Sequence, residues 1–147
     1  MEKIEILKQM VLFHNFDSLE LIQLSKLVGH RTYSEGELVI AEGEMGDSLF
    51  VVKSGQFKAF VTRDGVDQQL AVFNMGDSFG ELALLDKHPR SASVSALVEG
   101  ELLEFTKESF DKILQYSEKL KIKLLENLVY DLSLKLRRTN DRLVRLL

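Results

Sequence analysis

The first 28 residues carry apolar side chains at spacings of three and four. These positions fall into two groups, Ile6, Leu7, Met10 and Val11, then Leu19, Leu21, Ile22, Leu24 and Leu27. Such spacing is typical of short amphipathic helices, because side chains three or four residues apart share one helix face. Asp17 and Ser18 come directly before the second group, so we expect a helix N-cap near residue 17.

Between residues 29 and 105 the pattern changes to short runs of strand length that partly alternate apolar with polar positions. The runs cover residues 37–40, 48–52, 57–61, 69–73, 93–98 and 101–105. Glycine-containing turns separate them, and seven of the nine glycines lie between Gly36 and Gly80. Many short strands, with turns at intervals of roughly 8 to 12 residues, predict an antiparallel β-roll of jelly-roll-like form.

Residues 106–147 contain neither glycine nor proline and have a helical pattern. A first apolar patch at Phe110, Ile113 and Leu114 is followed by a polar stretch over residues 115–119. After it, steps of three and four alternate without a break, which is the a/d repeat of a coiled coil. The positions of this heptad seam are Ile122, Leu125, Val129, Leu132, Leu136, Thr139, Leu143 and Leu146.

A second apolar row, Leu120, Leu124 and Leu128, lies a quarter-turn or more from the heptad seam. In one interpretation this row packs on the β-roll while the seam meets the same helix of a second copy. In the other, both rows widen a single core face. The strict repeat favours the homodimer.

These patterns predict an α+β protein that forms a single domain over residues 1–147. Its antiparallel β-roll covers residues 29–105, flanked by N-terminal helices over 1–28 and by C-terminal helices over 106–147. The last of these helices is long and is the expected dimerisation helix.

Composition narrows the class of protein. The chain is 45% hydrophobic and 29% charged, an ordinary globular mixture. No apolar run approaches the roughly 20 residues that span a bilayer, and the N-terminus lacks signal-peptide features, so we expect a soluble cytoplasmic protein. There are no cysteines, and His14, His30 and His88 are too far apart for a helical zinc pair. We therefore expect neither a metal site nor an enzyme.

The net charge of −4 is unevenly distributed. Residues 119–147 hold eight Lys or Arg against three acidic residues, a local charge of +5, which leaves −9 for the first 118 residues. A basic tail of this kind can contact nucleic acid or an acidic lipid surface. More often it is the solvated face of a helix, and we favour that interpretation.

The candidate chemistry lies in residues 79–94. Gly80 lets backbone N–H groups approach an anion, and Arg90 offers a planar fork of donors to phosphate oxygens. Glu81 can accept a hydrogen bond from a sugar hydroxyl, and Ser91 can donate one to a phosphate or a base. These residues fit a phosphate-and-ribose site. They also fit a plain loop with a surface salt bridge between Glu81 and Arg90.

Residues 79–94 closely resemble the phosphate-binding cassette of the cyclic-nucleotide-binding domain family, which includes the catabolite activator protein and protein kinase A regulatory subunits. Residues 40–55 resemble the early strands and glycine turns of that family, and the likeness extends over nearly the whole chain. The positions that match the cassette are Phe79, Gly80, Glu81, Leu82, Ala83, Leu84, Arg90, Ser91, Ala92 and Val94.

The resemblance implies ligand contacts for eight of these ten positions. Arg90 would neutralise the cyclic phosphate, and Glu81 would hold the ribose 2′-hydroxyl. Gly80 and the amides of Leu82 and Ala83 would contact the phosphate or the ribose. Ser91 would lie beside the phosphate and the purine. Phe79 and Ala92 complete the ligand contacts that we expect in the cassette.

The resemblance of residues 132–143 to the long helix of the family's transcription regulators places Thr139 and Asn140 where a Thr-Ser pair reads the adenine. Thr139 also has a structural explanation, in which its hydroxyl bonds back to the preceding helical turn. Asn140 stands where the pattern has a Ser, so the choice between cyclic AMP (cAMP) and cyclic GMP (cGMP) stays open, with cAMP favoured.

The expected function is that of a regulatory sensor that binds cAMP or cGMP, needs no further cofactor, and reports occupancy through its C-terminal helix. A structural or interaction module that uses the heptad seam, with vestigial nucleotide binding, is the alternative. The 147 residues contain no helix-turn-helix pattern, so we expect no DNA-binding domain within them. They do not identify the downstream effector.

Overall fold

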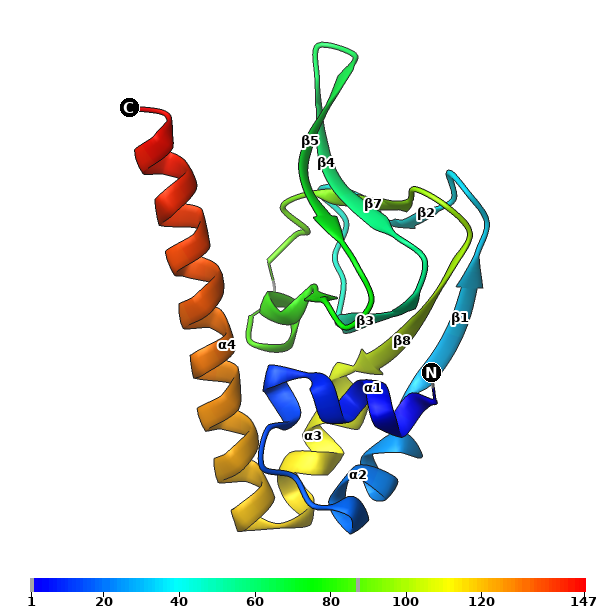
Figure 1. The fold of residues 1–147 in the computed structure, drawn as a ribbon, viewed down its shortest axis with the longest axis vertical. Helices are drawn as coiled ribbons and strands as arrows, with labels where there is room; N and C mark the ends of the chain where they lie inside the picture. Colours follow the sequence, from blue (N-terminus) through cyan, green and yellow to red (C-terminus); the bar gives the residue numbers. More distant parts are fainter. Residues whose placement is uncertain (1, 87) are drawn as a thin grey trace.

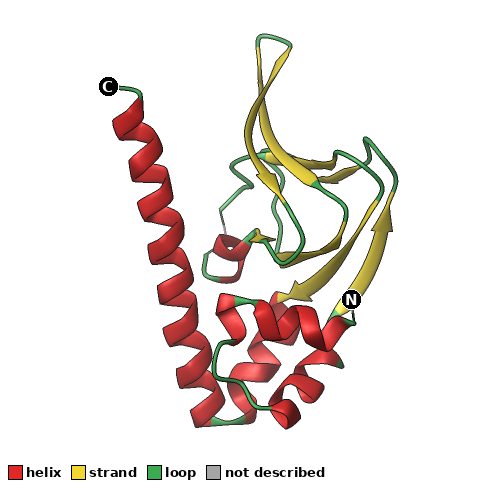
Figure 2. Ribbon diagram, viewed as in Figure 1, coloured by secondary structure: helices red, strands yellow, loops and turns green. Residues whose placement is uncertain are grey.

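Two four-stranded antiparallel sheets face each other in the computed structural model, which describes residues 2–86 and 88–147 (Figures 1 and 2). The strand order is β1-β8-β3-β6 in one sheet and β2-β7-β4-β5 in the other. The bounds are β1 Gly29–Tyr33, β2 Leu38–Ile40, β3 Ser48–Ser54, β4 Phe57–Arg63, β5 Val66–Phe73, β6 Ser78–Phe79, β7 Ser93–Ala96 and β8 Gly100–Thr106. This arrangement confirms the predicted α+β fold with an antiparallel β-roll.

Helices α1, α2 and α3 gather at one end of the roll, below it in Figure 1. Helix α4 starts at that end and runs up along the side of the roll. Their bounds are α1 Lys3–Gln9, the 3-10 turn η1 Val11–Phe13, α2 Ser18–Ser25, the 3-10 turn η2 Glu81–Leu84, α3 Lys107–Tyr116 and α4 Glu118–Arg145. Within the described residues, no helix has both the length and the apolar composition needed to cross a membrane.

The predicted N-cap near residue 17 is confirmed. The Asp17 carboxylate accepts a hydrogen bond from the Glu20 backbone N–H at 2.8 Å, and Glu20 Oε1 accepts one from the Asp17 N–H at 2.9 Å. This capping box satisfies two donors that the first helical turn leaves free. The sequence pattern therefore located the start of α2.

The polar stretch at residues 115–119 separates two helices. Ser117 adopts an extended conformation, with φ of −159°, and its hydroxyl accepts a hydrogen bond from the Leu120 N–H at 3.4 Å. It thus ends α3 and caps the 28 residues of α4. The expected pair of C-terminal helices, with a long second member, is confirmed.

Strand β3 separates two apolar cores. Side chains of successive strand residues point to opposite faces, so Phe50 and Val52 face the interior of the roll while Leu49 and Val51 face the helices. Burial on both faces explains why residues 48–52 form a continuous buried run. The helical core therefore packs against the outer face of the β1-β8-β3-β6 sheet, whose inner face belongs to the core of the roll.

The two apolar rows of α4 have different environments. Leu120, Leu124 and Leu128 are buried in the helical core. Along the heptad seam, by contrast, Val129 is 65% exposed and Leu136 is 61% exposed, although Leu132 packs in part against the core. The rows therefore do not form one widened core face, and the seam of the single chain is largely open to solvent.

Two strands escaped the sequence pattern, and both have a physical reason. In β1 four of the five residues are exposed, so the strand lacks apolar alternation and is held by its backbone pairing with β8. Strand β6 has only two residues, which pair with Phe50 and Val51. Neither element is long or apolar enough to produce a periodic signal.

Gly36 and Gly55 lie in turns and have similar φ angles, but of the two only Gly55 has close neighbours among the described residues. Comparing them separates the cost of the backbone conformation from the cost of a steric clash. Gly55 has φ of +79° and Gly36 has φ of +82°, so an alanine at either position is strained. A methyl group on Gly55 would lie 2.6 Å from the Glu99 carbonyl oxygen and 2.7 Å from the Gly100 Cα. Within the part of the chain that the structure describes, no atom lies within 4 Å of a methyl group on Gly36.

We expect Gly36→Ala to lower the free energy of unfolding by about 1 to 2 kcal/mol, the usual cost of the left-handed conformation. Gly55→Ala should lower it by roughly 3 kcal/mol or more, because backbone must also move. Urea denaturation followed by circular dichroism measures both values. Equal losses would show that the turn after β3 accommodates the methyl group.

Candidate functional site

Gly80 begins the cassette with a conformation that few other residues adopt. Its φ is +84°, and it links the end of β6 to the 3-10 turn η2. A Cβ at this position would lie 2.8 Å from both the Ser48 carbonyl oxygen and Arg90 Nη1. The absence of a side chain thus allows two parts of the chain to approach each other closely.

Phe79 anchors the cassette in the core of the roll. Its ring stacks on Phe50 at a centroid distance of 5.3 Å and on Phe73 at 4.8 Å. Phe50 belongs to β3 and Phe73 to β5, so the aromatic stack connects both sheets. The residue that precedes Gly80 is therefore held rigidly, as a preorganised site requires.

Arg90 is turned inward. Its Nη2 donates to the Ser48 carbonyl oxygen at 2.8 Å and its Nη1 to the Gly80 carbonyl oxygen at 3.3 Å. Arg90 Nε is buried and has no hydrogen-bond partner within residues 2–86 and 88–147. Burial lowers the pKa of the guanidinium, and the nearby carboxylates, Asp47 first, act in the opposite direction. A half-buried cation with an unused donor fits an anionic ligand.

Glu81 is buried and pairs with the long helix. Its Oε1 accepts a hydrogen bond from Lys135 Nζ at 2.7 Å. Its Oε2 is buried without a partner in the described part of the chain. A buried carboxylate oxygen without a donor is costly, so this atom is suited to a hydroxyl donor on a ligand. Glu81 and Arg90 thus bond to other groups rather than to each other.

A cavity of about 890 Å³ lies between the roll, the cassette and α4. Apolar side chains of the roll form one wall, and the pocket-facing side of α4 forms another. Nine of the ten predicted ligand contacts line it: Phe79, Gly80, Glu81, Leu82, Ala83, Arg90, Ser91, Ala92 and Thr139. Asn140, the tenth, is exposed and is not part of the lining. The roles of all ten residues stay predictions.

The α4 wall also holds charged residues that the sequence analysis did not single out: Asp131, Lys135, Arg138 and Arg142. They continue the buried row of Leu120, Leu124 and Leu128 toward the C-terminus at helical spacing. The change from leucine to charge along one helix face was the available signal. Thr139 lies on this face too, and its hydroxyl donates to the Lys135 carbonyl oxygen at 3.0 Å.

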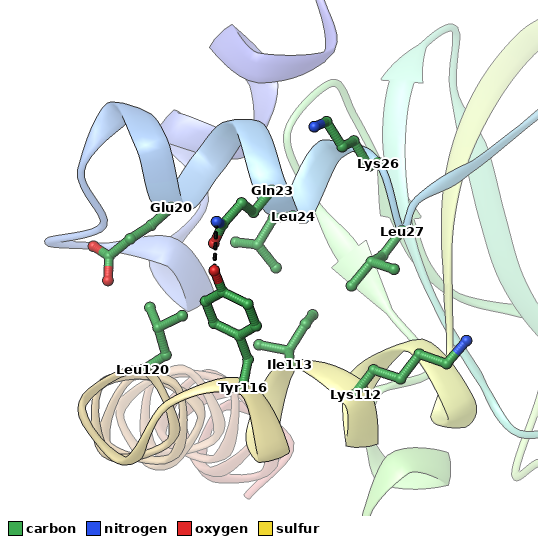
Figure 3. Close-up of a pocket in the computed structure, with 9 residues that line it drawn as sticks. All are labelled: Glu20, Gln23, Leu24, Lys26, Leu27, Lys112, Ile113, Tyr116 and Leu120. Atoms are coloured by element: carbon green, nitrogen blue, oxygen red, sulfur yellow. Dashed lines mark hydrogen bonds between the residues drawn. The ribbon is translucent and has the colours of Figure 1, made fainter.

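A second pocket, of about 300 Å³, lies between α2, α3 and the start of α4 (Figure 3). Its lining is largely apolar, and Gln23 Nε2 donates to the Tyr116 hydroxyl across it at 2.7 Å. None of the predicted ligand contacts lines it. The chemistry of the cassette is therefore confined to the larger cavity.

The sequence profile of the cyclic nucleotide-binding domain matches residues 30–117, and the chain belongs to that family. The domains of this family are regulatory sensors. Residues 30–117, which include the cassette and nearly all of the roll, thus form a cyclic-nucleotide-binding regulatory domain.

Individual relatives agree with this assignment. The chain is 31% identical to the cAMP-dependent protein kinase type II regulatory subunit of Drosophila melanogaster, over 86% of this chain and 32% of the relative. It is 34% identical to the cGMP-dependent protein kinase egl-4 of Caenorhabditis elegans, over 78% of this chain and 15% of the relative. The catabolite activator protein of Thermus thermophilus superposes with a TM-score of 0.81 at 30% identity, over 92% of this chain and 62% of that one.

The chain spans a third or less of the length of the curated kinase relatives. What is shared is the sensor domain, and the activities of the whole relatives are not carried over with it.

The close approach at Gly80 gives a prediction with a matched control. Gly76 also lines the cavity and has φ of +89°, but no atom of the described residues lies within 4 Å of a methyl group placed on it. Gly80→Ala should weaken binding of a cyclic nucleotide by about tenfold or more, because the methyl group displaces the Arg90 guanidinium. Gly76→Ala carries similar backbone strain and should change the affinity by less than about threefold.

Isothermal titration calorimetry measures both affinities, and thermal unfolding checks that each variant is folded. Similar losses of affinity in the two variants would contradict the proposed contact between Gly80 and Arg90.

Proposed function

We propose that this chain is a sensor that binds cAMP, with cGMP as the second candidate ligand, in the cavity between the roll and α4, and reports occupancy through α4. The ligand is the nucleotide alone, with no further cofactor and no catalytic step. The cytoplasm, where cyclic nucleotides are produced and sensed, is the proposed location. The downstream effector is not identified by the chemistry of the site.

The observation that carries the proposal is that two residues lining one cavity each have a buried polar atom without a partner, and that these atoms have opposite character. Among the residues that the structure describes, Arg90 Nε is a donor without an acceptor, and Glu81 Oε2 is an acceptor without a donor. A buried polar atom without a partner costs free energy, which a matching ligand group recovers. A cyclic nucleotide offers an anionic phosphate and a ribose hydroxyl within one small molecule.

The walls of the cavity support transmission through α4. The cassette forms one side and the helix face with Lys135 and Thr139 forms the other, so a ligand in the cavity contacts both. A ligand that binds two elements favours the arrangement in which they are close. Occupancy therefore changes the position or the mobility of α4 relative to the roll.

The hydroxyl of Thr139 supports the preference for cAMP. Because its one hydrogen is donated to the Lys135 carbonyl oxygen, the hydroxyl of this cavity-lining residue can only accept a hydrogen bond from a ligand. The exocyclic amino group of adenine can donate to those lone pairs, whereas guanine has a carbonyl oxygen at the same place. Arg138 lines the same wall and can donate to that carbonyl, so the preference should be modest. Asn140 stays a prediction that depends on a second copy, because it adjoins the heptad seam.

Titration calorimetry with cAMP and with cGMP separates the sensor from the alternative. A sensor binds at least one of them with a stoichiometry of one per chain. A structural or interaction module with a vestigial cassette binds neither, and that result would overturn the proposed function.

Arg90→Ala tests the phosphate contact. A hydrogen bond to a charged group contributes roughly 1.5 to 3 kcal/mol, so the affinity for cAMP should fall at least about tenfold. Arg63→Ala is the control, because Arg63 is an exposed arginine of β4 that pairs with Glu42 outside the cavity. A circular dichroism spectrum verifies the fold of each variant. An Arg90 variant that is folded and binds like the wild type would refute the contact.

The exposed heptad seam supports the second part of the proposal, a homodimer formed through α4. Isolated exposed leucines are ordinary, but this seam aligns apolar residues over most of a 28-residue helix. The row that would otherwise compete for the same role is already buried in the core. A second copy of the helix, packed a/d against a/d, is the occupant with the matching repeat.

Replacing Val129 and Leu136 by Glu should convert the dimer to a monomer, because carboxylates in the seam lie opposite those of the partner helix. Tyr130→Glu with Val144→Glu is the control, since these residues are similarly exposed but lie off the seam. Sedimentation velocity measures the association state. A wild type that stays monomeric at high micromolar concentration, with or without ligand, would contradict the seam assignment.

A further inference from the structure

Lys135 makes four polar contacts where α4 meets the cassette. Its Nζ lies 2.7 Å from Glu81 Oε1, 3.3 Å from an Asp131 carboxylate oxygen, and 3.1 Å from both the carbonyl and the hydroxyl oxygen of Ser78. The Lys135 side chain is 29% exposed, while the two carboxylates are 10% and 13% exposed. One ammonium group thus bridges two shielded carboxylates that belong to different elements.

This bridge determines which oxygen of Glu81 is available to a ligand. Oε1 is occupied by Lys135, and Oε2 stays buried without a donor in the described part of the chain. A carboxylate fixed at one oxygen cannot rotate without breaking that ion pair. The free oxygen, on a residue that lines the cavity, is therefore held in one orientation.

The charges around Glu81 also indicate that Lys135 supports ligand binding. Without the ammonium group, Glu81 and Asp131 would be two carboxylates with little solvent and no shared cation. Like charges in such a setting repel each other and disfavour ionisation. They would also repel an anionic ligand, whereas Lys135, together with Arg138 and Arg142 on the same wall, favours one.

We propose that Lys135 is a positioning residue for ribose recognition, and this inference rests on the proposed function. Lys135 holds Glu81 by Oε1 so that Oε2 accepts the hydrogen bond of the ribose 2′-hydroxyl. The ribose then hydrogen-bonds to one oxygen of the Glu81 carboxylate while α4 is held by the other. Glu81 binds the 2′-hydroxyl in this way only while Lys135 keeps α4 in contact with the cassette. The selectivity for ribose over 2′-deoxyribose therefore depends on the position of the helix.

A competing arrangement would have Lys135 block Glu81 until the ligand displaces it. The two arrangements predict opposite signs. If Lys135 blocks the site, its removal strengthens nucleotide binding. If Lys135 positions Glu81, its removal weakens binding and reduces the discrimination between ribose and 2′-deoxyribose.

Lys123 offers a matched control on the same helix. Its Nζ pairs with Glu20 at 3.0 Å and with the Asn15 carbonyl oxygen at 2.9 Å, and its side chain is 23% exposed. It therefore resembles Lys135 in exposure and in bonding α4 to the body of the protein. It does not line the cavity, so a loss of helix stability alone is common to both variants.

The experiment compares the wild type with Lys135→Met, Lys135→Arg and Lys123→Met. Calorimetry gives the dissociation constants for cAMP and for 2′-deoxy-cAMP. In the wild type and in Lys123→Met, the deoxy analogue should bind about tenfold or more weakly, as expected for a lost hydrogen bond to a carboxylate. In Lys135→Met, cAMP should bind at least about fivefold more weakly than in the wild type, and the analogue ratio should shrink to about threefold or less. Lys135→Arg retains the cation and should restore most of the ratio.

Hydrogen exchange of the ligand-free proteins provides a second readout. Amides in residues 131–142 should exchange faster in Lys135→Met than in Lys123→Met, because the contact with Ser78 and Glu81 is lost. In Lys135→Arg, which retains the cation, the amides of residues 131–142 should exchange as slowly as in the wild type.

The possible results separate this inference from the proposed function. If the wild type binds neither cAMP nor cGMP, the proposed function fails and the ribose role of Lys135 fails with it. If the wild type binds, but Lys135→Met keeps the full analogue ratio or binds more tightly, only the role of Lys135 is wrong. Unchanged exchange in residues 131–142 would show that Lys135 does not hold the helix.

Discussion

The half-buried Arg90 guanidinium is the group on which the geometry of the site depends. A cation partly shielded from water needs acceptors, and the carbonyl oxygens of Ser48 and Gly80 supply two. They come close enough only because Gly46 and Gly80 lack side chains, since a methyl group on either would overlap the guanidinium. The arginine thus ties β3 to the start of the cassette. Its remaining donor, Nε, is buried and has no hydrogen-bond partner among residues 2–86 and 88–147.

Helix α4 is continuous, but its environment changes along its length. In its first half a leucine row closes the helical core, and in its second half the same face carries charge and lines the cavity. Lys135 and Arg142 hydrogen-bond this second half to the cassette and the roll, at Ser78, Glu81 and the Leu70 carbonyl oxygen. A helix anchored firmly at one end and by a few polar contacts at the other is suited to respond to a ligand.

The elements that were predicted correctly have strong local signals. The N-cap at Asp17, the Gly-punctuated strands and the break before Glu118 follow from side chains close together in sequence. The cassette was found through its resemblance to a family, because residues 79–94 hold nearly all its chemistry in one segment. Strands β1 and β6 were missed, since each is defined by its neighbours: β1 by pairing with β8, and β6 by two residues against β3.

Local periodicity, turn residues and one contiguous motif were enough to predict the fold class, the family and the cassette. The partners of the two charged cassette residues, by contrast, became known only from the folded arrangement of the chain. Glu81 and Arg90 are nine positions apart and could have paired, but Glu81 bonds to Lys135, 54 positions away, and Arg90 to Ser48, 42 positions away. Such pairings arise from how α4 and β3 pack around the cassette. The hydrophobic burial of Leu120, Leu124 and Leu128 sets the course of the helix, and the polar contacts further along it follow from that packing.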